Sequence, residues 1–103
     1  METEKNNIYQ EFAAEASALQ ARSVALRRDL HRHPETGWLE MRTTAIIVRR
    51  LRALGYQVLT GREVCLESAR LGLPDADIMA AHAEAVLQQG VTEEELTPDL
   101  REG

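Results

Sequence analysis

Cysteine is almost missing from this sequence, and aromatic side chains are scarce. Cys65 stands alone, which excludes an internal disulfide and any cysteine-based zinc knuckle. Aromatic residues make up 4% of the 103 residues. Fourteen positions are alanine, a residue that favours helix but buries little apolar area. We therefore expect at most one domain, rich in helix and with a thin core.

Long hydrophobic runs are absent as well. No stretch approaches the roughly 18–20 consecutive apolar residues that a membrane-spanning helix needs. Residues 1–7 lack the basic region and apolar stretch of a secretory signal. We expect a cytoplasmic protein without a membrane partner.

Basic and acidic residues are separated along the chain, whose net charge is −5. Ten of the twelve basic residues fall between Arg22 and Arg70. After Arg70, every charged residue except Arg101 is acidic. A basic middle raises the question of nucleic acid. The arginines, however, are interleaved with acids, and no set of aromatic side chains for base stacking accompanies them. Solvated helix faces are therefore favoured, and no nucleic-acid partner is expected.

The first segment is expected to form one long helix over residues 7–32. Asn7 and Gln10 resemble a capping box at its start. Apolar residues recur at three- and four-residue steps, with a polar step at Ser23. The stripe consists of Ile8, Phe12, Ala16, Leu19, Leu26 and Leu30. Pro34 disfavours helical geometry at His33 and should end the helix.

A second helix is predicted over residues 39–54, with an apolar face of Ile47, Val48, Leu51 and Leu54. Gly55 occupies the position of a left-handed cap. Residues 56–59 alternate as a short strand that ends at Gly61. A helix, a glycine and a strand in this order are typical of an α/β fold.

A third helix is predicted over residues 75–89, with Ile78, His82, Ala85 and Val86 on one face and Gly90 after its end. Thr92 to Glu95 could cap a final turn before a charged end. The pattern thus gives two long helices, one short strand and a third helix. A lone strand leaves both edges unpaired, so either residues 56–59 are not a strand or the partner strands are missing. We class the chain as a mostly helical piece of an α/β fold.

The most suggestive chemical pattern is the pair His31 and His33, with Asp29 and Glu35 nearby. On a strand, such a pair would place both imidazoles on one side. On a helix, residues two apart diverge by roughly 200°. Asp29 and His33 have the spacing that helical ligands favour, but Pro34 makes helical geometry at His33 doubtful. Histidines at a helix end are the preferred interpretation, and no metal ligand is assigned.

The remaining candidates are explained more simply by structure. Cys65 lacks a supporting histidine motif, so a small buried apolar role is favoured over a nucleophile. His82 is expected to be packed or partly exposed, and Glu93 to Glu95 to form a solvated acidic turn. No phosphate loop, nucleophile elbow or His-Glu-x-x-His motif occurs. We therefore assign no catalytic, cofactor-binding or metal-binding residue to this chain.

Two longer stretches resemble a known family. Residues 26–40, read as LRRDLHRHPETGWLE, precede RTTAII at 42–47 and LGYQV at 54–58. In this order they resemble the start of the aminoacylase, hippurate hydrolase and carboxypeptidase family of two-metal amidohydrolases. Residues 61–74, followed by a helix that ends in QQG, look like an insertion of the p-aminobenzoyl-glutamate hydrolase branch.

The resemblance implies an α/β sandwich with an inserted dimerisation domain, and two divalent ions, zinc or manganese, that activate water against an amide bond. It implies that residues 1–60 hold the N-terminal helices and first strand of the catalytic domain, and residues 61–103 a helical insertion with a charged end. The family's metal ligands and general base match no position here. A homo- or hetero-oligomer is possible within the family.

We therefore expect the N-terminal part of an amidohydrolase that cleaves N-acyl amino acids resembling p-aminobenzoyl-glutamate, inactive as this chain alone. The alternative is a small helical interaction module without catalysis. A role in binding nucleic acid is a distant third.

Overall fold

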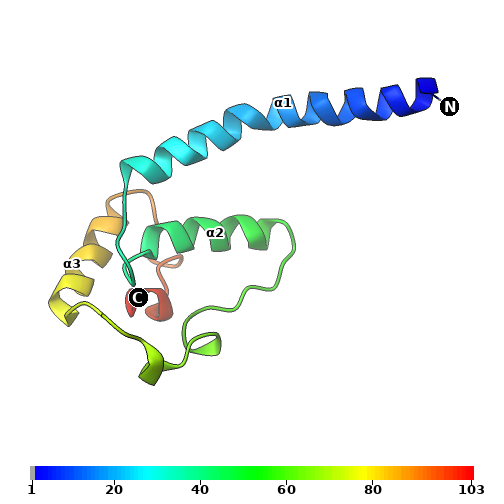
Figure 1. Cartoon of the computed structure of the whole chain (residues 1–103). Coiled ribbons are helices and arrows are strands. Elements are labelled where there is room, and N and C mark those ends of the chain that lie inside the picture. The colour runs from blue at the N-terminus through cyan, green and yellow to red at the C-terminus, as the bar shows by residue number, and fades with distance from the viewer. Residues whose placement is uncertain (1) are drawn as a thin grey trace. The chain divides into compact units, whose positions relative to one another are not determined.

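The computed structural model describes residues 2–103, which form helices joined by irregular segments (Figure 1). Four α-helices are present among them: α1 (Glu2–Arg32), α2 (Met41–Ala53), α3 (Ala76–Leu87) and α4 (Pro98–Arg101). Two 3-10 turns, η1 (Gly61–Glu63) and η2 (Glu67–Ala69), lie between α2 and α3. No helix within this part of the chain combines the length and apolar character needed to cross a bilayer.

The chain divides into two units, and each is described by itself. The first ends at Pro34 and consists of α1; the second is Glu35–Gly103 and holds all the other elements. The boundary expected from the sequence is a different one. It separates the catalytic-domain part, residues 1–60, from the helical insertion, residues 61–103, in the full-length family fold, and it stays a prediction.

Helix α1 begins earlier than its sequence predicts. The capping box at Asn7 and Gln10 is wrong as a start signal, since the helix already runs from Glu2. No proline or glycine interrupts residues 2–7, and Glu2 and Glu4 place negative charge at the positive end of the helix dipole. The predicted stop is confirmed, because the helix ends at Arg32, two residues before Pro34.

The predicted cap at the end of α2 is confirmed in detail. Gly55 has a φ of +90°, a left-handed conformation that glycine adopts without steric cost. Its N–H donates to the carbonyl of Arg52, and the N–H of Tyr56 donates to that of Leu51, both at 3.0 Å. These two bonds form a Schellman motif, which satisfies carbonyls that the helix end leaves unpaired.

The strand predicted at residues 56–59 is wrong. In the described part of the chain this segment runs without secondary structure and pairs with no other strand. Tyr56 and Leu59 are both exposed. Local alternation favours an extended backbone, but a ladder needs a neighbour whose donors and acceptors it can pair with. The described residues are therefore helical and irregular, and the α/β assignment does not hold for them.

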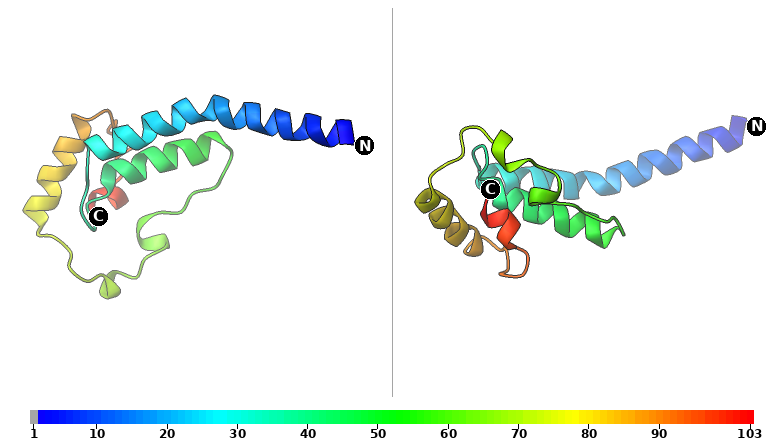
Figure 2. Two further views of the ribbon diagram at one scale, coloured as in Figure 1. Left: turned by 45° about the horizontal axis from the view of Figure 1, so that its top comes forward. Right: turned by 90° about the horizontal axis from the view of Figure 1, so that it is seen from below.

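The core of the second unit is small and lies where α2, α3 and α4 meet. In both views of Figure 2, α4 (red) lies beside α2 (green), and these helices contact each other. The buried residues of this cluster come from the three helices and the segments that flank them: Leu39, Met41, Ala45, Met79, Ala83, Val86, Val91, Leu96 and Leu100. Four of the nine are Ala or Met and none is aromatic, which agrees with the expected thin core.

The buried faces of α2 and α3 differ from those predicted. Helix α2 buries Met41, Arg42, Ala45 and Ile46, whereas Ile47 is 49% exposed and Leu54 74%. Helix α3 buries Met79, Ala83 and Val86, and Ile78 is exposed. In both helices the apolar residues are too numerous for one narrow stripe, so periodicity does not decide which side packs.

Helix α4 and its connection to α3 complete the unit. Thr92 and Glu95 form the predicted capping turn: the N–H of each donates to the other's side-chain oxygen, at 3.0 and 3.2 Å. Helix α4 was not predicted, and only a charged end was expected there. Pro98 at its first position, after Thr97 as N-cap, is a common start of a helix.

Candidate functional site

The Glu35 carboxylate is the centre of a buried polar network in the second unit. Its side chain is only 2% exposed, yet it lies outside any helix, six residues before α2 begins. Oε2 accepts a hydrogen bond from the backbone N–H of Arg42 at 2.8 Å. Oε1 accepts bonds from the N–H and the hydroxyl of Thr43, both at 2.7 Å.

These bonds cap the N-terminus of α2 from a distance. The first N–H groups of a helix have no partner within it. Glu40, in the N-cap position, makes no side-chain capping bond. Glu35 instead satisfies the second and third N–H groups of the helix, and its negative charge suits the positive end of the helix dipole. Residues 35–43 thus fold into one closed turn.

His82 connects this cap to α3. Its Nε2 lies 2.7 Å from Oε2 of Glu35, and the carboxylate accepts the bond when Nε2 carries the proton. Burial alone would raise the pKa of Glu35. The hydrogen bond from His82 and those from Thr43 and Arg42 outweigh it and hold the pKa below its ordinary value. The carboxylate is therefore charged at neutral pH, although it is almost fully enclosed.

Arg42 joins the same two helices by a second route. When backbone and side chain are counted together, Arg42 is the one charged residue of the described chain that is buried. Its Nε donates a hydrogen bond of 3.0 Å to the carbonyl of Gln89, just beyond the end of α3. A buried guanidinium that binds a carbonyl fixes the spacing of two elements rather than presenting charge to a ligand.

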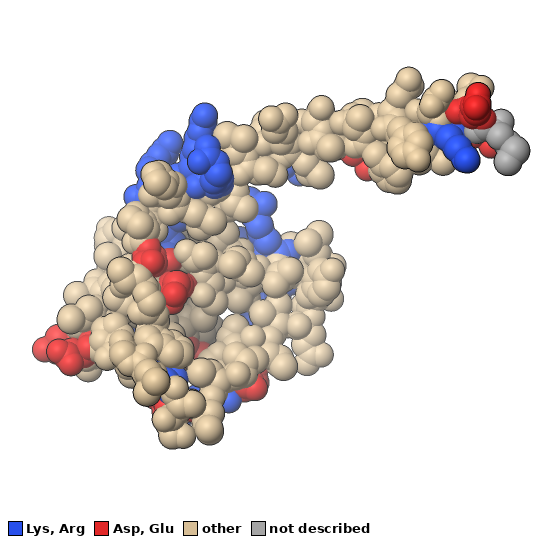
Figure 3. Space-filling model, viewed as in Figure 1, with Lys and Arg blue, Asp and Glu red and all other residues tan. Residues whose placement is uncertain are grey.

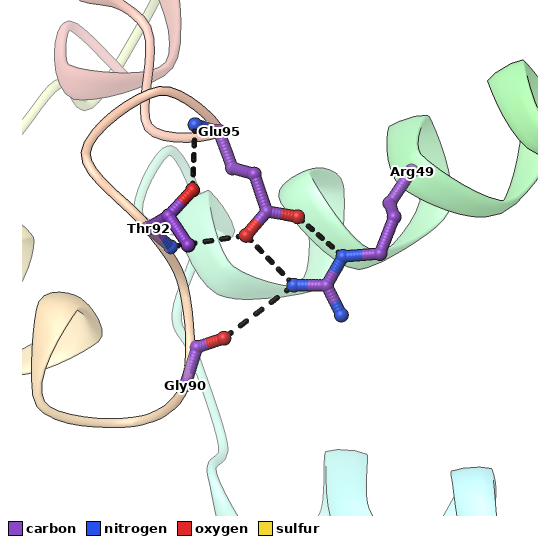
Figure 4. Close-up of polar contacts among 4 residues, drawn as sticks. All are labelled: Arg49, Gly90, Thr92 and Glu95. Carbon is purple, nitrogen blue, oxygen red and sulfur yellow. Dashed lines mark hydrogen bonds and ion pairs between the residues drawn. The ribbon is translucent and has the colours of Figure 1, made fainter.

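Arg49, further along α2, holds the turn that leads to α4 (Figure 4). Its guanidinium forms two parallel bonds to Glu95: Nε pairs with Oε2, and Nη2 donates to Oε1 at 2.8 Å. Nη2 also lies 3.4 Å from the carbonyl of Gly90. Hydrogen bonds from Arg49 and then from the N–H of Thr92 lower the pKa of Glu95 to about 2.

The expectation of a solvated acidic turn at Glu93 to Glu95 is therefore wrong for Glu95 alone. Glu95 is half-buried and paired with Arg49. Glu93 is exposed, but its carboxylate accepts a bond of 2.6 Å from Arg101 on α4. The exposed side chains of Glu93 and Glu94 agree with the expectation.

Trp38 and Arg70 form a third polar centre. The backbone of Trp38 has a φ of +67°, unusual for a bulky residue, and its Nε1 donates to the carbonyl of Leu71 at 2.7 Å. The Arg70 guanidinium lies over the indole ring, 4.5 Å from its centroid. Arg70 also donates to the carbonyls of Glu102 and Gly103, at 2.7 and 3.1 Å. These contacts hold the irregular segment between α2 and α3 against the residues that follow α4.

A pocket of about 260 Å³ opens beside Arg49. Its walls are apolar side chains of α2 and α4 together with several polar groups: Ala45, Val48, Arg49, Arg52, Thr60, Glu95, Thr97 and Leu100. The guanidinium of Arg49 is already engaged by Glu95. The pocket therefore offers no preorganised pair of acid and base.

The candidates identified from sequence are not assembled into a reactive site. His33 follows the end of α1 and contacts its last turn, where its Nδ1 lies 3.0 Å from the carbonyl of Asp29, and His31 is exposed. Cys65 is a half-buried free thiol. Across residues 2–103, no three His, Cys, Asp or Glu side chains lie close enough to share a metal ion. That no residue here is catalytic or binds metal stays a prediction.

The sequence did not predict that Glu35 caps α2 and bonds to His82. Glu35 was considered only as a neighbour of the pair His31 and His33. A usable signal was present, since a Pro-Glu turn a few residues before a helix that lacks a good N-cap residue leaves N–H groups in need of an acceptor. The partnership with His82 had no such signal, because the two residues are 47 positions apart.

No family model matches the chain. Among curated proteins, one component of the p-aminobenzoyl-glutamate hydrolase of Escherichia coli K12 is 45% identical over 64 residues. Indole-3-acetyl-aspartic acid hydrolase of Enterobacter agglomerans is 39% identical over 67 residues. These matches cover 62% and 65% of this chain, but only 15% of the length of each relative.

A solved structure extends the match to three dimensions. The aminobenzoyl-glutamate utilization protein of Klebsiella pneumoniae superposes with a TM-score of 0.80 at 37% sequence identity. The superposition covers 86% of this chain and 22% of that protein. The chain therefore carries a segment of the amidohydrolase family that includes p-aminobenzoyl-glutamate hydrolase and indole-3-acetyl-aspartic acid hydrolase.

Proposed function

We propose that this chain is the N-terminal bracing segment of a metal-dependent amidohydrolase that cleaves the amide bond of N-acyl amino acids such as p-aminobenzoyl-glutamate. Two relatives support the reaction class, because each is a hydrolase of an amino acid conjugate. The zinc or manganese ions of such an enzyme would be bound by residues beyond those present here.

The observation that carries the bracing role is the Glu35 network. A catalytic carboxylate must present at least one oxygen to substrate, water or metal. Both oxygens of Glu35 are instead occupied by the first turn of α2 and by His82. The described residues do not fit a two-metal centre, since no three potential ligands lie together among them. No step of hydrolysis is therefore assigned to this chain.

The first test is an assay of the purified chain with p-aminobenzoyl-glutamate and added zinc or manganese. We expect no release of p-aminobenzoate, because among residues 2–103 no three His, Cys, Asp or Glu side chains lie close enough to share a metal ion that would activate water. Turnover above the buffer blank that is lost on adding a chelator would contradict the proposal.

The second test places the segment in a complete enzyme. In the Escherichia coli hydrolase, the matched residues are replaced by those of this chain. We expect the chimera to retain hydrolysis. In the chimera, Glu35→Gln should lower the unfolding temperature and leave kcat almost unchanged. Glu84→Gln, on the exposed side of α3, is the matched control. A loss of kcat without a loss of stability would assign Glu35 to catalysis instead.

A second candidate is a small helical interaction module without catalysis. Ile47 on α2 and Leu54 just after its end favour it, because these exposed apolar side chains are open to a partner; Leu54 is 74% exposed. Denaturant titration followed by circular dichroism separates the two candidates. A cooperative transition of the isolated chain supports an independent module, and gradual unfolding supports a segment of a larger fold.

A further inference from the structure

Helices α2 and α4 lie side by side (Figure 2), and residues of both line the pocket of about 260 Å³ beside Arg49. Ala45, Val48 and Leu100 supply its apolar side chains. Ala45 and Leu100 also belong to the buried core, so packing holds this wall in place. Every residue that lines the pocket belongs to the second unit. The pocket is therefore formed within one compact unit of the chain.

Three polar side chains at this pocket have no partner in the described part of the chain. Arg52 follows Val48 by one turn of α2 and makes no hydrogen bond or ion pair with residues 2–103. Thr60 and Thr97 occupy the N-cap positions of η1 and α4, but neither makes the side-chain capping bond that is common for threonine there. Neither hydroxyl bonds to any other described residue. One guanidinium and two hydroxyl groups at the pocket are thus available to a ligand.

The charge at the pocket is that of one arginine. Arg49 and Glu95 also line it, but they neutralise each other through two parallel bonds (Figure 4). Arg52 therefore contributes the one uncompensated charge of the lining residues. On the face of the second unit seen in Figure 3, acidic and basic side chains lie in small separate groups with uncharged surface between them. A single positive charge beside an apolar wall suits a ligand with one negative charge rather than a polyanion.

We propose that this pocket binds a small monocarboxylate with an apolar body, of the size of benzoate. The carboxylate accepts hydrogen bonds from the guanidinium of Arg52 and from the hydroxyls of Thr60 and Thr97. The apolar body lies against Val48 and Leu100. Pockets for small molecules usually measure roughly 300–1,000 Å³, so a space of about 260 Å³ admits a compact molecule of this kind.

Another part of a polypeptide is a poorer occupant of this pocket. An apolar protein surface would cover Arg52, Thr60 and Thr97 and leave their donors without acceptors, and a buried donor without a partner costs more than a typical hydrogen bond contributes. A carboxylate supplies acceptors to these donors and still offers an apolar body to the wall. The proposal does not depend on the amidohydrolase assignment, because it needs only residues of the second unit.

Titration of the whole chain with benzoate, followed in proton–nitrogen correlation NMR spectra, tests the site. We expect saturable shifts of the amide signals of Thr60, Thr97 and Leu100, with a dissociation constant on the order of 1 mM for so small a ligand. Benzamide has a similar shape but no charge, and it should bind roughly tenfold more weakly. An absence of saturable shifts would leave the pocket to another part of a polypeptide, and equal binding of benzamide would show that no carboxylate is recognised. Either result would overturn the proposal.

The charge of Arg52 is tested by a variant that keeps its polar end. We expect Arg52→Gln to weaken benzoate binding roughly tenfold and to change benzamide binding little. Arg50→Gln removes the same charge at an exposed position of α2 outside the pocket, and it should leave benzoate binding unchanged. Equal weakening by the two variants would point to general attraction of anions and would contradict a site at Arg52.

The apolar wall is tested by a charge placed against it. We expect Val48→Asp to abolish benzoate binding, because a carboxylate then faces the ligand's own charge and apolar body. Ile47→Asp, at the neighbouring position outside the pocket and 49% exposed, is the matched control and should bind benzoate as the wild-type chain does. Circular dichroism checks that both variants keep their helix content. A folded Val48→Asp chain that binds benzoate undiminished would refute the placement of the ligand.

Discussion

The Nε2 atom of His82 lies 2.7 Å from Oε2 of Glu35, and this contact joins the first turn of α2 to the middle of α3. The carboxylate is nearly excluded from solvent, and donors from the backbone and from two side chains surround it. Removal of Glu35 leaves the N–H groups of Arg42 and Thr43 without their acceptor, which costs more than the bonds themselves contribute.

Substitution of Glu35 should therefore destabilise the second unit strongly. We expect Glu35→Gln to lower the free energy of unfolding by about 2 kcal/mol, since an amide can replace at most part of a charged acceptor's bonds. Thermal unfolding followed by circular dichroism at 222 nm provides the measurement. Glu84→Gln, exposed on α3, should change the unfolding temperature little. Equal effects of the two variants would contradict the role given to Glu35.

The same network makes stability depend on acid. Because the pKa of Glu35 is lowered in the folded chain, its contribution is fully present above the ordinary value of 4.5 and is lost as the pH falls through the folded value. Unfolding midpoints measured between pH 7 and pH 3 should fall for the wild-type chain more than for Glu35→Gln. Parallel curves for the two proteins would show that Glu35 is not the group responsible.

Glu95 should titrate at unusually low pH. The guanidinium of Arg49 and the N–H of Thr92 hold the pKa of its carboxyl at about 2. We expect Arg49→Met to move it up towards 4.5, which the carboxyl carbon shift in NMR spectra would report. Arg50→Met, at the next and also exposed position of α2, removes the same charge without the contact and should leave Glu95 unchanged.

Gly55 tests the end of α2. An alanine there would be forced into a left-handed conformation at φ +90°, so Gly55→Ala should cost about 1 kcal/mol of stability. The space around both Gly55 and Gly37 is open, with nothing within 4 Å of an added Cβ, but Gly37 has no such φ. Gly37→Ala should therefore be neutral or slightly stabilising in the same denaturation experiment.

Trp38, the single tryptophan of the chain, reports on Arg70. The Arg70 side chain over its ring is 5% exposed and shields one face of the indole from water. We expect Arg70→Gln to shift the fluorescence emission to longer wavelength and to reduce stability. Arg62→Gln, which alters only an exposed ion pair with Glu102, should leave the emission unchanged.

Local signals in the sequence predicted the three longer helices, their stops and the turn at Thr92 well. Pro34, Gly55 and the Thr92–Glu95 pair act over a few residues, so their effect is visible without tertiary structure. The prediction of a strand at residues 56–59 was wrong because strand formation also depends on a partner elsewhere in the chain. Its alternation is also local, but a strand exists only when another strand pairs with it, and none does among residues 2–103.

The candidate site was harder to predict than the helices. Glu35 and His82 are 47 positions apart, and Arg49 and Glu95 are 46 apart, so no spacing rule connects either pair. The choice of Ala45 and Ile46 rather than Ile47 as the buried face of α2 likewise depends on where α3 and α4 lie. The resemblance to amidohydrolases did not depend on these contacts, which explains why the family could be identified before the fold.

The distant cap on α2 also has a consequence for how this unit folds. An ordinary N-cap residue adjoins its helix, so the first turn can form and melt by itself. Here the acceptor for the N–H groups of Arg42 and Thr43 is Glu35, which lies seven and eight residues upstream and is bonded to a side chain of another helix. The first turn of α2 and the packing of α3 against it should therefore form and unfold together, because both depend on Glu35.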